Sequence, residues 1–369
     1  MRQFKTSPKS MGYTMPFEGN PHQGTIVLLP YRTDTWRCHA KPARKVFLEL
    51  IEIIRKYEKV YLIADPRIPE AELEPFCLPG VEILRLPYND SWARDNTLIY
   101  LTKTDGLLAV DFRFNAWGGA VDGLYPDYAA DDALGKRVAE ALRQPLLSLP
   151  DFILEGGSIH TDGEGTLLVT EACLLSAGRN AGMTKAEIEE LLKESLGMDK
   201  VLWLKHGIYN DETNEHIDNM ACFLSPGVIA VAVSRDKEDI QYVYSTEAVR
   251  TLERETDAKG RPLQIIQIPV PAPLQMTAEE ADTLILGEGI QRLAGNRLAA
   301  SYINFYQSDR FVIVPKFNVK EDEEALQILK NFYRDKDVYQ LESREILLGG
   351  GNIHCITMQI PKEEKKNEN

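Results

Sequence analysis

The sequence predicts an α/β protein in which five ββαβ units close into a ring of small blades. Hairpin-like pairs of strand patterns start near residues 97, 158, 217, 302 and 352, and the separations leave room in each unit for a helix and a further strand. The segment EGGSIH at residues 155–160 also resembles GGGNIH at 349–354, and both lie where a strand passes into the next hairpin. Such a repeat fits a closed ring better than a doubly wound sheet.

The predicted hairpins alternate apolar and polar residues and turn at Asp-Gly, Pro-Gly or Ser-Asp sequences. They cover residues 96–112, 158–170, 218–233 and 302–315, and a fifth begins at Asn352. We expect the run at residues 25–29 to pair with this last hairpin, because closure of the ring removes an exposed strand edge.

Helical periodicity follows most of the hairpins and also precedes the first one. It predicts helices at residues 43–56, 130–142, 184–196, 246–254, 278–293 and 321–332. Thr184 and Glu187 have the spacing of a capping box, which marks the start of one of these helices. Short strand-like runs then complete the units at residues 81–87, 145–150, 201–204, 263–268 and 338–341.

The composition is that of an ordinary globular protein. Hydrophobic residues make up 44% and charged residues 27%, which excludes the disordered and low-complexity classes. No apolar run approaches the roughly 18 residues needed to cross a bilayer, and the first residues lack the apolar region of a secretion signal. We therefore expect a cytoplasmic protein without a membrane partner. One domain is expected over residues 1–369, with a core at about 15–361 and a disordered tail at 362–369.

The net charge limits the expected ligands, and the number and spacing of the cysteines indicate their redox state. The net charge is −14 and no extended cluster of Lys and Arg is present, so a nucleic-acid partner is not expected. An acidic field favours small cationic ligands. Five cysteines without a Cys-x-x-Cys pair indicate reduced thiols, one of which is a candidate for reactivity. Cys38, Cys173 and Cys222 lack the spacing of zinc ligands and are expected to be inert.

The most informative polar residues occupy equivalent places, directly after one strand and before the next hairpin. They are Asp95, Glu155, His216, Asp218 and Cys355. Because equivalent loops of a ring of repeats point toward one axis, these side chains are expected to converge although they are far apart in the sequence. The His-x-Asp spacing also places His216 and Asp218 on one face of an extended segment.

This combination of residues predicts a site for a guanidinium group. Three carboxylates and a thiolate repel one another unless a cation compensates, and the planar fork of a guanidinium matches the paired oxygens of Asp95 and Asp218. Its central carbon is a poor electrophile, so we expect the Cys355 thiolate to attack it. His216 would protonate the departing ammonia and later take a proton from water, while Glu155 orients the imidazole.

Several segments that carry these residues are similar to motifs of the agmatine deiminase family. They are WARD at 92–95, FNAWGG at 114–119, LEGGSIH at 154–160, DETNEHIDN at 211–219, ASYINFY at 300–306 and LGGGNIHCIT at 348–357. The resemblance extends over about residues 15–361. It implies the five-bladed α/β propeller called the pentein fold, and it places the nucleophile, the histidine and the carboxylates on the same five residues.

The resemblance also implies a reaction, its metabolic role and the absence of a cofactor. Agmatine would be hydrolysed to N-carbamoylputrescine and ammonia through an amidino-cysteine intermediate, without a metal or an organic cofactor, as in polyamine metabolism. A homodimer is implied by the family alone. Trp92, three residues before Asp95, is expected to line the substrate channel, whereas His160 and His354 are expected to be structural.

The chain departs from the family pattern in two places. Asn96 and Thr97 follow Asp95 where the family usually has Thr-Gly-Pro, and Met358 stands where it usually has Gln. Both positions flank the expected site, so they bear on the shape of the pocket and not on its chemical groups.

Three alternatives remain open from the sequence. Peptidyl-arginine deimination would use the same residues with a wider mouth, a non-catalytic member of the fold would serve as a binding module, and a zinc hydrolase would use His216 and the acids as ligands. Agmatine lacks the carboxylate of arginine, so a narrow acidic channel without a cationic anchor favours it. The residues that could supply such an anchor are Arg94, Arg235 and Arg297.

Overall fold

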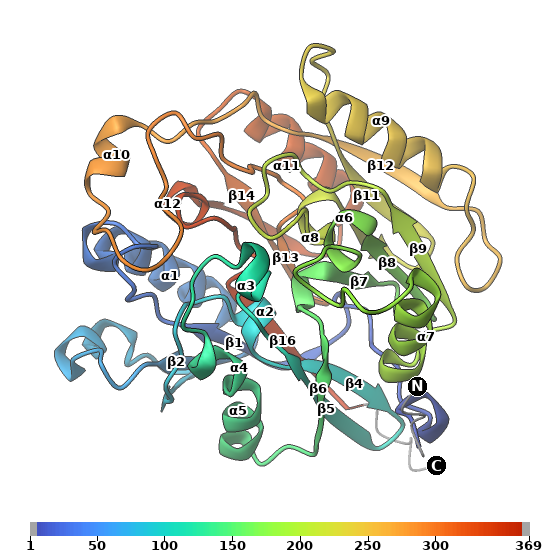
Figure 1. The fold of residues 1–369 in the computed structure, drawn as a ribbon, viewed down its shortest axis with the longest axis horizontal. Helices are drawn as coiled ribbons and strands as arrows, with labels where there is room; N and C mark the ends of the chain where they lie inside the picture. Colours follow the sequence, from blue (N-terminus) through green and yellow to red (C-terminus); the bar gives the residue numbers. More distant parts are fainter. Residues whose placement is uncertain (1–5, 364–369) are drawn as a thin grey trace.

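The computed structural model describes residues 6–363, which form five small sheets arranged around a common centre (Figure 1). Four sheets have three strands each. They are β4 (Ile99–Lys103), β5 (Gly106–Arg113) and β6 (Leu146–Ile153); β7 (Ile159–Thr161), β8 (Thr166–Thr170) and β9 (Lys200–Leu204); β10 (Ala221–Ser225), β11 (Val228–Val233) and β12 (Gln264–Pro269); and β13 (Tyr306–Gln307), β14 (Phe311–Lys316) and β15 (Asp337–Glu342).

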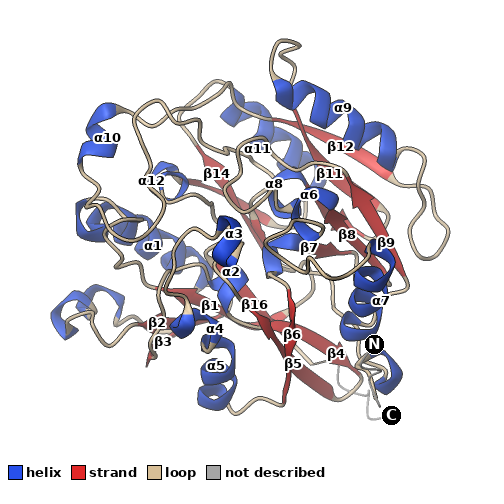
Figure 2. Ribbon diagram, viewed as in Figure 1, coloured by secondary structure: helices blue, strands red, loops and turns tan. Residues whose placement is uncertain are grey.

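Each of these sheets repeats the predicted ββαβ connection. The first two strands pair antiparallel across a short turn, and the third lies parallel to the second. A parallel neighbour requires a crossover connection, which a helix supplies in each unit. The crossover helices are α5 (Leu134–Leu142), α7 (Lys185–Leu196), α9 (Ile240–Leu252) and α11 (Glu321–Phe332), and Figure 2 shows them around the outside of the sheets.

Local sequence signals explain these helices. The Thr184 side chain accepts from the backbone of Glu187 and the Glu187 side chain accepts in return, so the predicted capping box of α7 is confirmed. Gly197 ends that helix with a φ of 70°, a conformation that glycine adopts without a steric penalty. Four acidic residues in the first turn of α11 lie where the helix dipole favours negative charge.

The fifth sheet joins the two ends of the described chain and closes the ring. β1 (His22–Leu28) pairs antiparallel with β16 (Thr357–Pro361), in a register that places Ile26 opposite Met358. α1 (Lys41–Ile54) then leads to β2 (Lys59–Ala64), which lies parallel to β1. The prediction that residues 25–29 close the ring is therefore confirmed, and neither β1 nor β16 is left without a partner.

The structure corrects the predicted elements at several places. The third strand of the closing sheet is β2, whereas β3 (Val81–Arg85), which the sequence suggested for that role, is an additional edge strand. The helix expected at 278–293 ends after α10 (Ala278–Asp282), and glycines at 287, 289 and 295 weaken any continuation. The helix expected at 130–142 is divided into α4 (Ala129–Asp132) and α5, and the helix expected at 246–254 begins earlier, at Ile240.

Two further expectations concern membrane-spanning segments and the C-terminal tail. Within residues 6–363, no helix combines the length and the apolar character needed to cross a membrane. Lys362 and Glu363 are exposed, and the remainder of the tail predicted at 362–369 lies outside the described residues.

We predict that ring closure contributes strongly to stability. Ile26 is fully buried in β1, between β16 and β2, so Ile26→Ala leaves a cavity and should lower the free energy of unfolding by about 2–5 kcal/mol. Gln23→Ala, at an exposed position of the same strand, should change it by less than about 0.5 kcal/mol. Urea denaturation followed by circular dichroism measures both, and equal effects would contradict a closing role for this sheet.

Candidate active site

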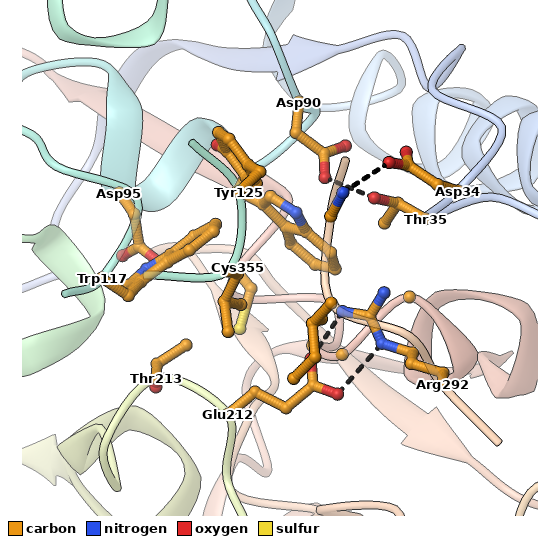
Figure 3. A pocket seen from close by; sticks show the side chains of 17 residues that line it. Asp34, Thr35, Asp90, Asp95, Trp117, Tyr125, Glu212, Thr213, Arg292 and Cys355 are labelled. Atoms are coloured by element: carbon orange, nitrogen blue, oxygen red, sulfur yellow. Dashed lines mark hydrogen bonds and ion pairs between the residues drawn. The ribbon is translucent and has the colours of Figure 1, made fainter. Parts of the chain in front are cut away.

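The segments that precede the hairpins meet at the centre of the ring. α2 (Ala93–Asn96), the single turn Gly156–Ser158 and α8 (Ile217–Met220) each end where a hairpin begins, and the loop before β16 carries Cys355. A pocket opens beside them. Figure 3 shows Asp95, Trp117 and Cys355 in its wall. The convergence expected from the repeat is therefore present in the structure.

Cys355 lies at the inner wall of this pocket and is 6% exposed. Its Sγ lies 3.2 Å from the amide nitrogen of Asn304 and 3.5 Å from Oδ2 of Asp218. Burial raises the pKa of this thiol well above its ordinary value, and the negative charges of Asp218 and Asp95 raise it further. The thiol is therefore held in its protonated form while no cation occupies the site.

The two carboxylates expected to bind a guanidinium differ in their partners. Asp95 accepts at Oδ1 from the backbone N–H of Gly157 (2.8 Å) and at Oδ2 from the indole N–H of Trp117 (2.9 Å). Asp218 accepts at Oδ2 from Nδ1 of His354 (2.9 Å), while its buried Oδ1 has no hydrogen-bond partner. One oxygen of Asp218 is thus unpaired, although Asp218 is buried and does not line the pocket.

The charge states of these two carboxylates also differ. Burial raises the pKa of Asp95 to about 6, against the opposing effect of His216. Burial acts in the same direction on Asp218, but the hydrogen bond and the charge of His354 outweigh it and lower the pKa below its ordinary value. Asp218 is therefore ionised throughout the neutral range, whereas Asp95 titrates close to it.

His216 lies between two carboxylates without contacting either closely. Its Nδ1 is 3.8 Å from Oδ2 of Asp95, and its Nε2 is 3.9 Å from Oε2 of Glu155. Burial by itself would lower the pKa of His216, but Asp95, Cys173 and Glu155 raise it well above its ordinary value. The imidazole is therefore protonated, as a proton donor requires.

Glu155 is completely buried, and its nearest charged partner is Arg179, whose Nε lies 2.7 Å from Oε1. Arg179 is not among the residues predicted from the sequence. Its guanidinium also donates to the side-chain oxygen of Asn214 (2.7 Å) and to the carbonyl of Thr213 (2.9 Å), so it connects Glu155 to the loop that carries His216. Glu155 therefore fixes the position of that loop as well as facing the imidazole.

The loop before His216 is held in a constrained backbone conformation. Asn214 and Glu215 have φ values of 64° and 65°, in the left-handed region that non-glycine residues seldom adopt. Ala116 and Trp117 share this feature, with φ values of 53° and 64°. Consecutive left-handed residues occur here in loops that carry side chains of the candidate site.

Close packing explains why Gly157 stands at the centre of the cluster. A Cβ at this position would lie 2.6 Å from Nδ1 of His216, 2.9 Å from Oδ1 of Asp95 and 3.0 Å from Oδ2 of Asp218. A side chain would therefore displace all three groups. The same distances show that these three groups surround one point of the backbone.

Trp92 lines the pocket, as the sequence predicts. Its ring stacks on Trp36 at a centroid distance of 5.1 Å and meets Trp117 edge-on at 6.4 Å. Gly351 leaves room for this ring, because a Cβ there would lie 2.5 Å from it. The aromatic groups give the pocket a rigid apolar wall beside Cys355.

Most of the charged residues that line the pocket are acidic. Asp34, Asp90 and Glu212 line it together with Arg292, whose Nε donates to Glu212 at 3.0 Å (Figure 3). Asp34 accepts from Nη2 of Arg32 at 2.9 Å. The lining therefore contains more carboxylates than cations, and the guanidinium of Arg292 is already paired.

Sequence reasoning missed two further residues of the cluster. Asn304 donates to Cys355 Sγ and accepts from the backbone N–H groups of His354 (3.0 Å) and Cys355 (3.3 Å). A buried asparagine within the apolar segment 302–306 is the signal that could have identified it. Glu18, in the segment before β1, contacts His354 and has no comparable signal.

Potential metal ligands form two groups within the described part of the chain. Glu18, His160 and His354 form one, and Glu155, Cys173 and His216 form the other; in each, the ligand atoms lie within 4.8 Å of one another. Cys173, which is predicted to be inert because it lacks the linear spacing of a zinc ligand, thus lies close to Glu155 and His216, which are far away in the sequence.

The two departures from the family pattern lie outside the pocket lining. The Asn96 side chain donates to the carbonyl of Asp90 (2.8 Å) and to Asp131 (3.0 Å), and Thr97 donates back to its own helical turn. Met358 lies beneath the site against Arg94, whose Nη1 is 3.7 Å from its sulfur. None of the three residues contacts the pocket.

Comparison with known proteins gives consistent results. The profile of the Porphyromonas-type peptidyl-arginine deiminase family matches residues 14–361. A relative from Selenomonas ruminantium that carries an agmatine deiminase name is 45% identical over 366 residues, covering 98% of this chain and 99% of the relative. The solved agmatine deiminase of Enterococcus faecalis is 35% identical, with a TM-score of 0.93 over 98% of this chain and 99% of the other.

A third similar protein has been solved with a ligand. It is a cysteine-to-serine variant of the agmatine deiminase of C. jejuni with substrate bound. This protein is 28% identical to the present chain, with a TM-score of 0.81 over 95% of this chain and 96% of the other.

We predict that Asp218 suppresses the reactivity of Cys355 in the free protein. Asp218→Asn removes a negative charge 3.5 Å from Sγ, so it should lower the pKa of the thiol and speed its alkylation by iodoacetamide at pH 8 by about tenfold per pKa unit. Peptide mass spectrometry measures the rate, with exposed Cys77 as the internal control. An unchanged ratio of the two rates would contradict this electrostatic role.

Proposed function

The chain belongs to the Porphyromonas-type peptidyl-arginine deiminase family, and we propose that it hydrolyses the guanidinium group of agmatine, giving N-carbamoylputrescine and ammonia. One observation carries this proposal. Asp95 and Asp218 flank a buried thiol, that of Cys355, at the inner end of an acidic pocket. Such a group of negative charges is stable when a planar cation occupies the space between them.

Substrate binding activates the nucleophile in this proposal. The thiol of Cys355 is protonated in the free site because of burial and of the carboxylates near it. A guanidinium held by Asp95 and Asp218 neutralises those charges and lowers the pKa of the thiol. The thiolate therefore forms when its target carbon is in place, which protects it from unproductive reactions.

The reaction then proceeds by two displacements at one carbon. Sγ of Cys355 forms a bond to the guanidinium carbon, His216 donates a proton to one nitrogen, and the bond from carbon to that nitrogen breaks to release ammonia. Water attacks the resulting amidino-thioether and gives a proton to His216. The C–S bond breaks, which regenerates the thiolate, and the new hydroxyl group loses its remaining proton to solvent, where the released ammonia takes it up. A neutral urea group is left on the product.

The surroundings of His216 suit both proton transfers. Asp95 and Glu155 face its two ring nitrogens at 3.8 and 3.9 Å and favour the charged imidazole. Neither nitrogen is tied by a short hydrogen bond to these carboxylates, so the ring can give up a proton when the leaving group forms. Glu155 and Arg179 hold the loop that presents it.

The pocket favours agmatine over arginine and over an arginine within a peptide. A substrate carboxylate needs a free cation, but the three candidate arginines are paired elsewhere: Arg94 with Glu18, Arg235 with Glu324 and Arg297 with Asp239. None of them lines the pocket, and Arg292, which does, is paired with Glu212. The acidic lining instead suits the ammonium group at the other end of agmatine.

The proposed activity is accompanied by proposals for the compartment, the pathway, the oligomeric state and the cofactor requirement. We propose that the protein acts in the cytoplasm on the route from agmatine toward putrescine, and that it works as a homodimer without a metal or organic cofactor. Gel filtration with light scattering tests the dimer, and elemental analysis of the active protein tests the rival zinc mechanism, which requires a stoichiometric metal.

We predict selective turnover of agmatine. The purified protein should release ammonia from agmatine and add about one mass unit to it, because an imino nitrogen is replaced by oxygen, while free arginine and an arginine peptide should react at least about a hundredfold more slowly. Cys355→Ser should abolish turnover. Preferential turnover of the peptide would keep the mechanism and reject the substrate, and no turnover of any guanidinium would favour a binding module.

We also predict that kcat/KM falls on the acid side of about pH 6. Asp95 has a raised pKa of about 6, so its carboxylate is charged above that pH and is protonated as the pH decreases through it. A neutral Asp95 binds a guanidinium poorly, so kcat/KM should fall about tenfold per pH unit below this value.

Asp111→Asn is the matched control for this profile. The pKa of Asp111 is also raised to about 6, but this residue does not line the pocket. The control should leave the acid limb unchanged. A wild-type kcat/KM that stays constant from pH 7 to pH 5 would contradict the assignment of Asp95.

A further inference from the structure

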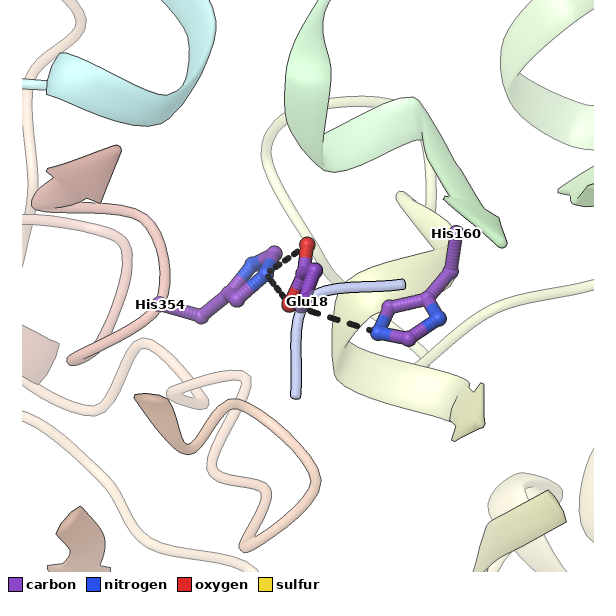
Figure 4. A group of neighbouring side chains, drawn as sticks. All are labelled: Glu18, His160 and His354. Atoms are coloured by element: carbon purple, nitrogen blue, oxygen red, sulfur yellow. Dashed lines mark hydrogen bonds and ion pairs between the residues drawn. The ribbon is translucent and has the colours of Figure 1, made fainter. Parts of the chain in front are cut away.

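The segment before β1 carries a buried carboxylate, Glu18, which contacts His354 next to the candidate site. Glu18 is 2% exposed and lies between the rings of His160 and His354, as Figure 4 shows. Its two carboxylate oxygens are each 3.0 Å from Nε2 of His354, and Oε1 accepts from Nη1 of Arg94 at 3.1 Å. The proposed reaction does not use this residue, and its burial is offset by these donors, because a buried charge is costly only when it is not paired.

The geometry of His354 determines its charge. Nδ1 faces Oδ2 of Asp218 at 2.9 Å, and Nε2 faces Glu18 at 3.0 Å. A neutral imidazole carries one N–H group, so it can donate to one of two carboxylates and not to both. Donation on both sides requires the imidazolium form, which the two negative charges stabilise.

His160 occupies a different position in the cluster. Its Nδ1 accepts from the backbone N–H of Phe223 at 3.2 Å, so the ring presents Nε2–H to Glu18, at 3.4 Å. Arg94 also fixes the loop of His354, because its Nε donates to the carbonyl of that residue at 3.3 Å. The charges of Glu18 are thus already compensated by donors, which leaves no lone pair of His160 directed toward a metal ion.

The contacts of His354 determine the orientation and the charge of Asp218. Because His354 occupies Oδ2, the carboxylate is held in one orientation, and its Oδ1 is left without a hydrogen-bond partner. The positive charge of His354 also keeps Asp218 ionised beside the other negative groups of the site. Asp95 has no comparable second cation behind it, and its pKa is raised instead.

We propose that Glu18 is a positioning residue for the reaction, which acts through the His354 imidazolium to orient Asp218 and keep it charged for guanidinium binding. This inference rests on the proposed function. It assigns a role to the N-terminal segment and to His354, which the sequence suggested was structural. The chain of contacts runs from Glu18 to His354 and from there to Asp218, with Arg94 balancing the second negative charge.

Other titratable groups contribute to the field at these residues. His354 is surrounded by Glu18, Asp218, Arg94 and His160, and Asp218 is also affected by His216 and lies 3.5 Å from Cys355. Removing the charge of Glu18 weakens the imidazolium form of His354. Asp218 then loses the nearest cation that lowers its pKa, so it becomes protonated at a higher pH.

The decisive variant is Glu18→Gln, which keeps the size of the side chain and removes its charge. We expect the pKa of Asp218 to rise toward that of Asp95 in this variant, so the acid limb of kcat/KM for agmatine should become steeper, approaching about a hundredfold per pH unit, and move to higher pH. The loss should appear in KM, while kcat changes less than about threefold. Glu18→Asp, which restores the charge, should return the acid limb toward the wild-type position.

The matched control is Glu58→Gln. Glu58 is also a buried carboxylate beside a histidine, with Oε2 at 3.2 Å from Nδ1 of His22, but it contacts none of the residues assigned to the reaction. If Glu58→Gln moves the acid limb as far as Glu18→Gln does, the effect is one of general stability and the inference is wrong. An unchanged profile in Glu18→Gln would also overturn it.

A direct measurement separates this inference from the proposed function. In protein labelled with ¹³C at the histidine rings, the His354 resonance should remain that of an imidazolium to pH 8 in the wild type and titrate at lower pH in Glu18→Gln. His354→Ala assigns the resonance. A neutral His354 in the wild type at pH 7 would refute the inference, whereas an imidazolium in a protein that turns over no agmatine would refute the function alone.

Discussion

Buried negative charge at the centre of the ring is the constraint on which the rest of the site depends. Asp95, Glu155 and Asp218 come from three different units, and Glu18 adds a fourth carboxylate from the segment before β1. A group of this kind is unstable in a dry interior unless cations and N–H donors compensate it. The compensation is distributed over the fold, with Arg179 beside Glu155 and with Arg94 and His354 beside Glu18.

This distribution leaves one place where the balance is incomplete. Around Asp95 and Asp218, the protein supplies Cys355, a peptide N–H group and the imidazole of His216, which lies 3.8 Å from Asp95 without a short hydrogen bond. The raised pKa values of Asp95 and of the Cys355 thiol have the same cause. The site therefore carries excess negative charge that a bound guanidinium would neutralise. Binding of the guanidinium would also lower the pKa of the Cys355 thiol, so the nucleophile becomes reactive when the substrate binds.

The sequence was sufficient for the features that repeat or that form local patterns. Hairpins with clear turns, the capping box of α7 and the closure by β1 could all be predicted, because each depends on neighbouring residues or on the exposed edge that would otherwise remain. The convergence of Cys355 with Asp95 and Asp218 followed from the repeat itself. The helix expected at 278–293 was wrong because apolar periodicity outweighed the glycines that interrupt it.

The supporting residues could not be predicted in the same way. Glu18 lies in a segment without periodicity, and its partners are brought to it only when the ring closes. Arg179 likewise reaches Glu155 through tertiary packing, and linear spacing concealed the proximity of Cys173 to His216. A charge that is compensated across the fold leaves no signature in the sequence near either partner, whereas a reactive side chain within a glycine-rich loop does.

The order of the elements along the chain has a consequence for biosynthesis. Cys355 directly precedes β16, and β16 is the strand that pairs with β1, near the opposite end of the chain. During translation, four sheets can be completed before either the nucleophile or the closing strand has been made. A chain that terminates before Cys355 therefore lacks both the nucleophile and the closing strand, so the nucleophile and the closure of the ring are acquired almost together.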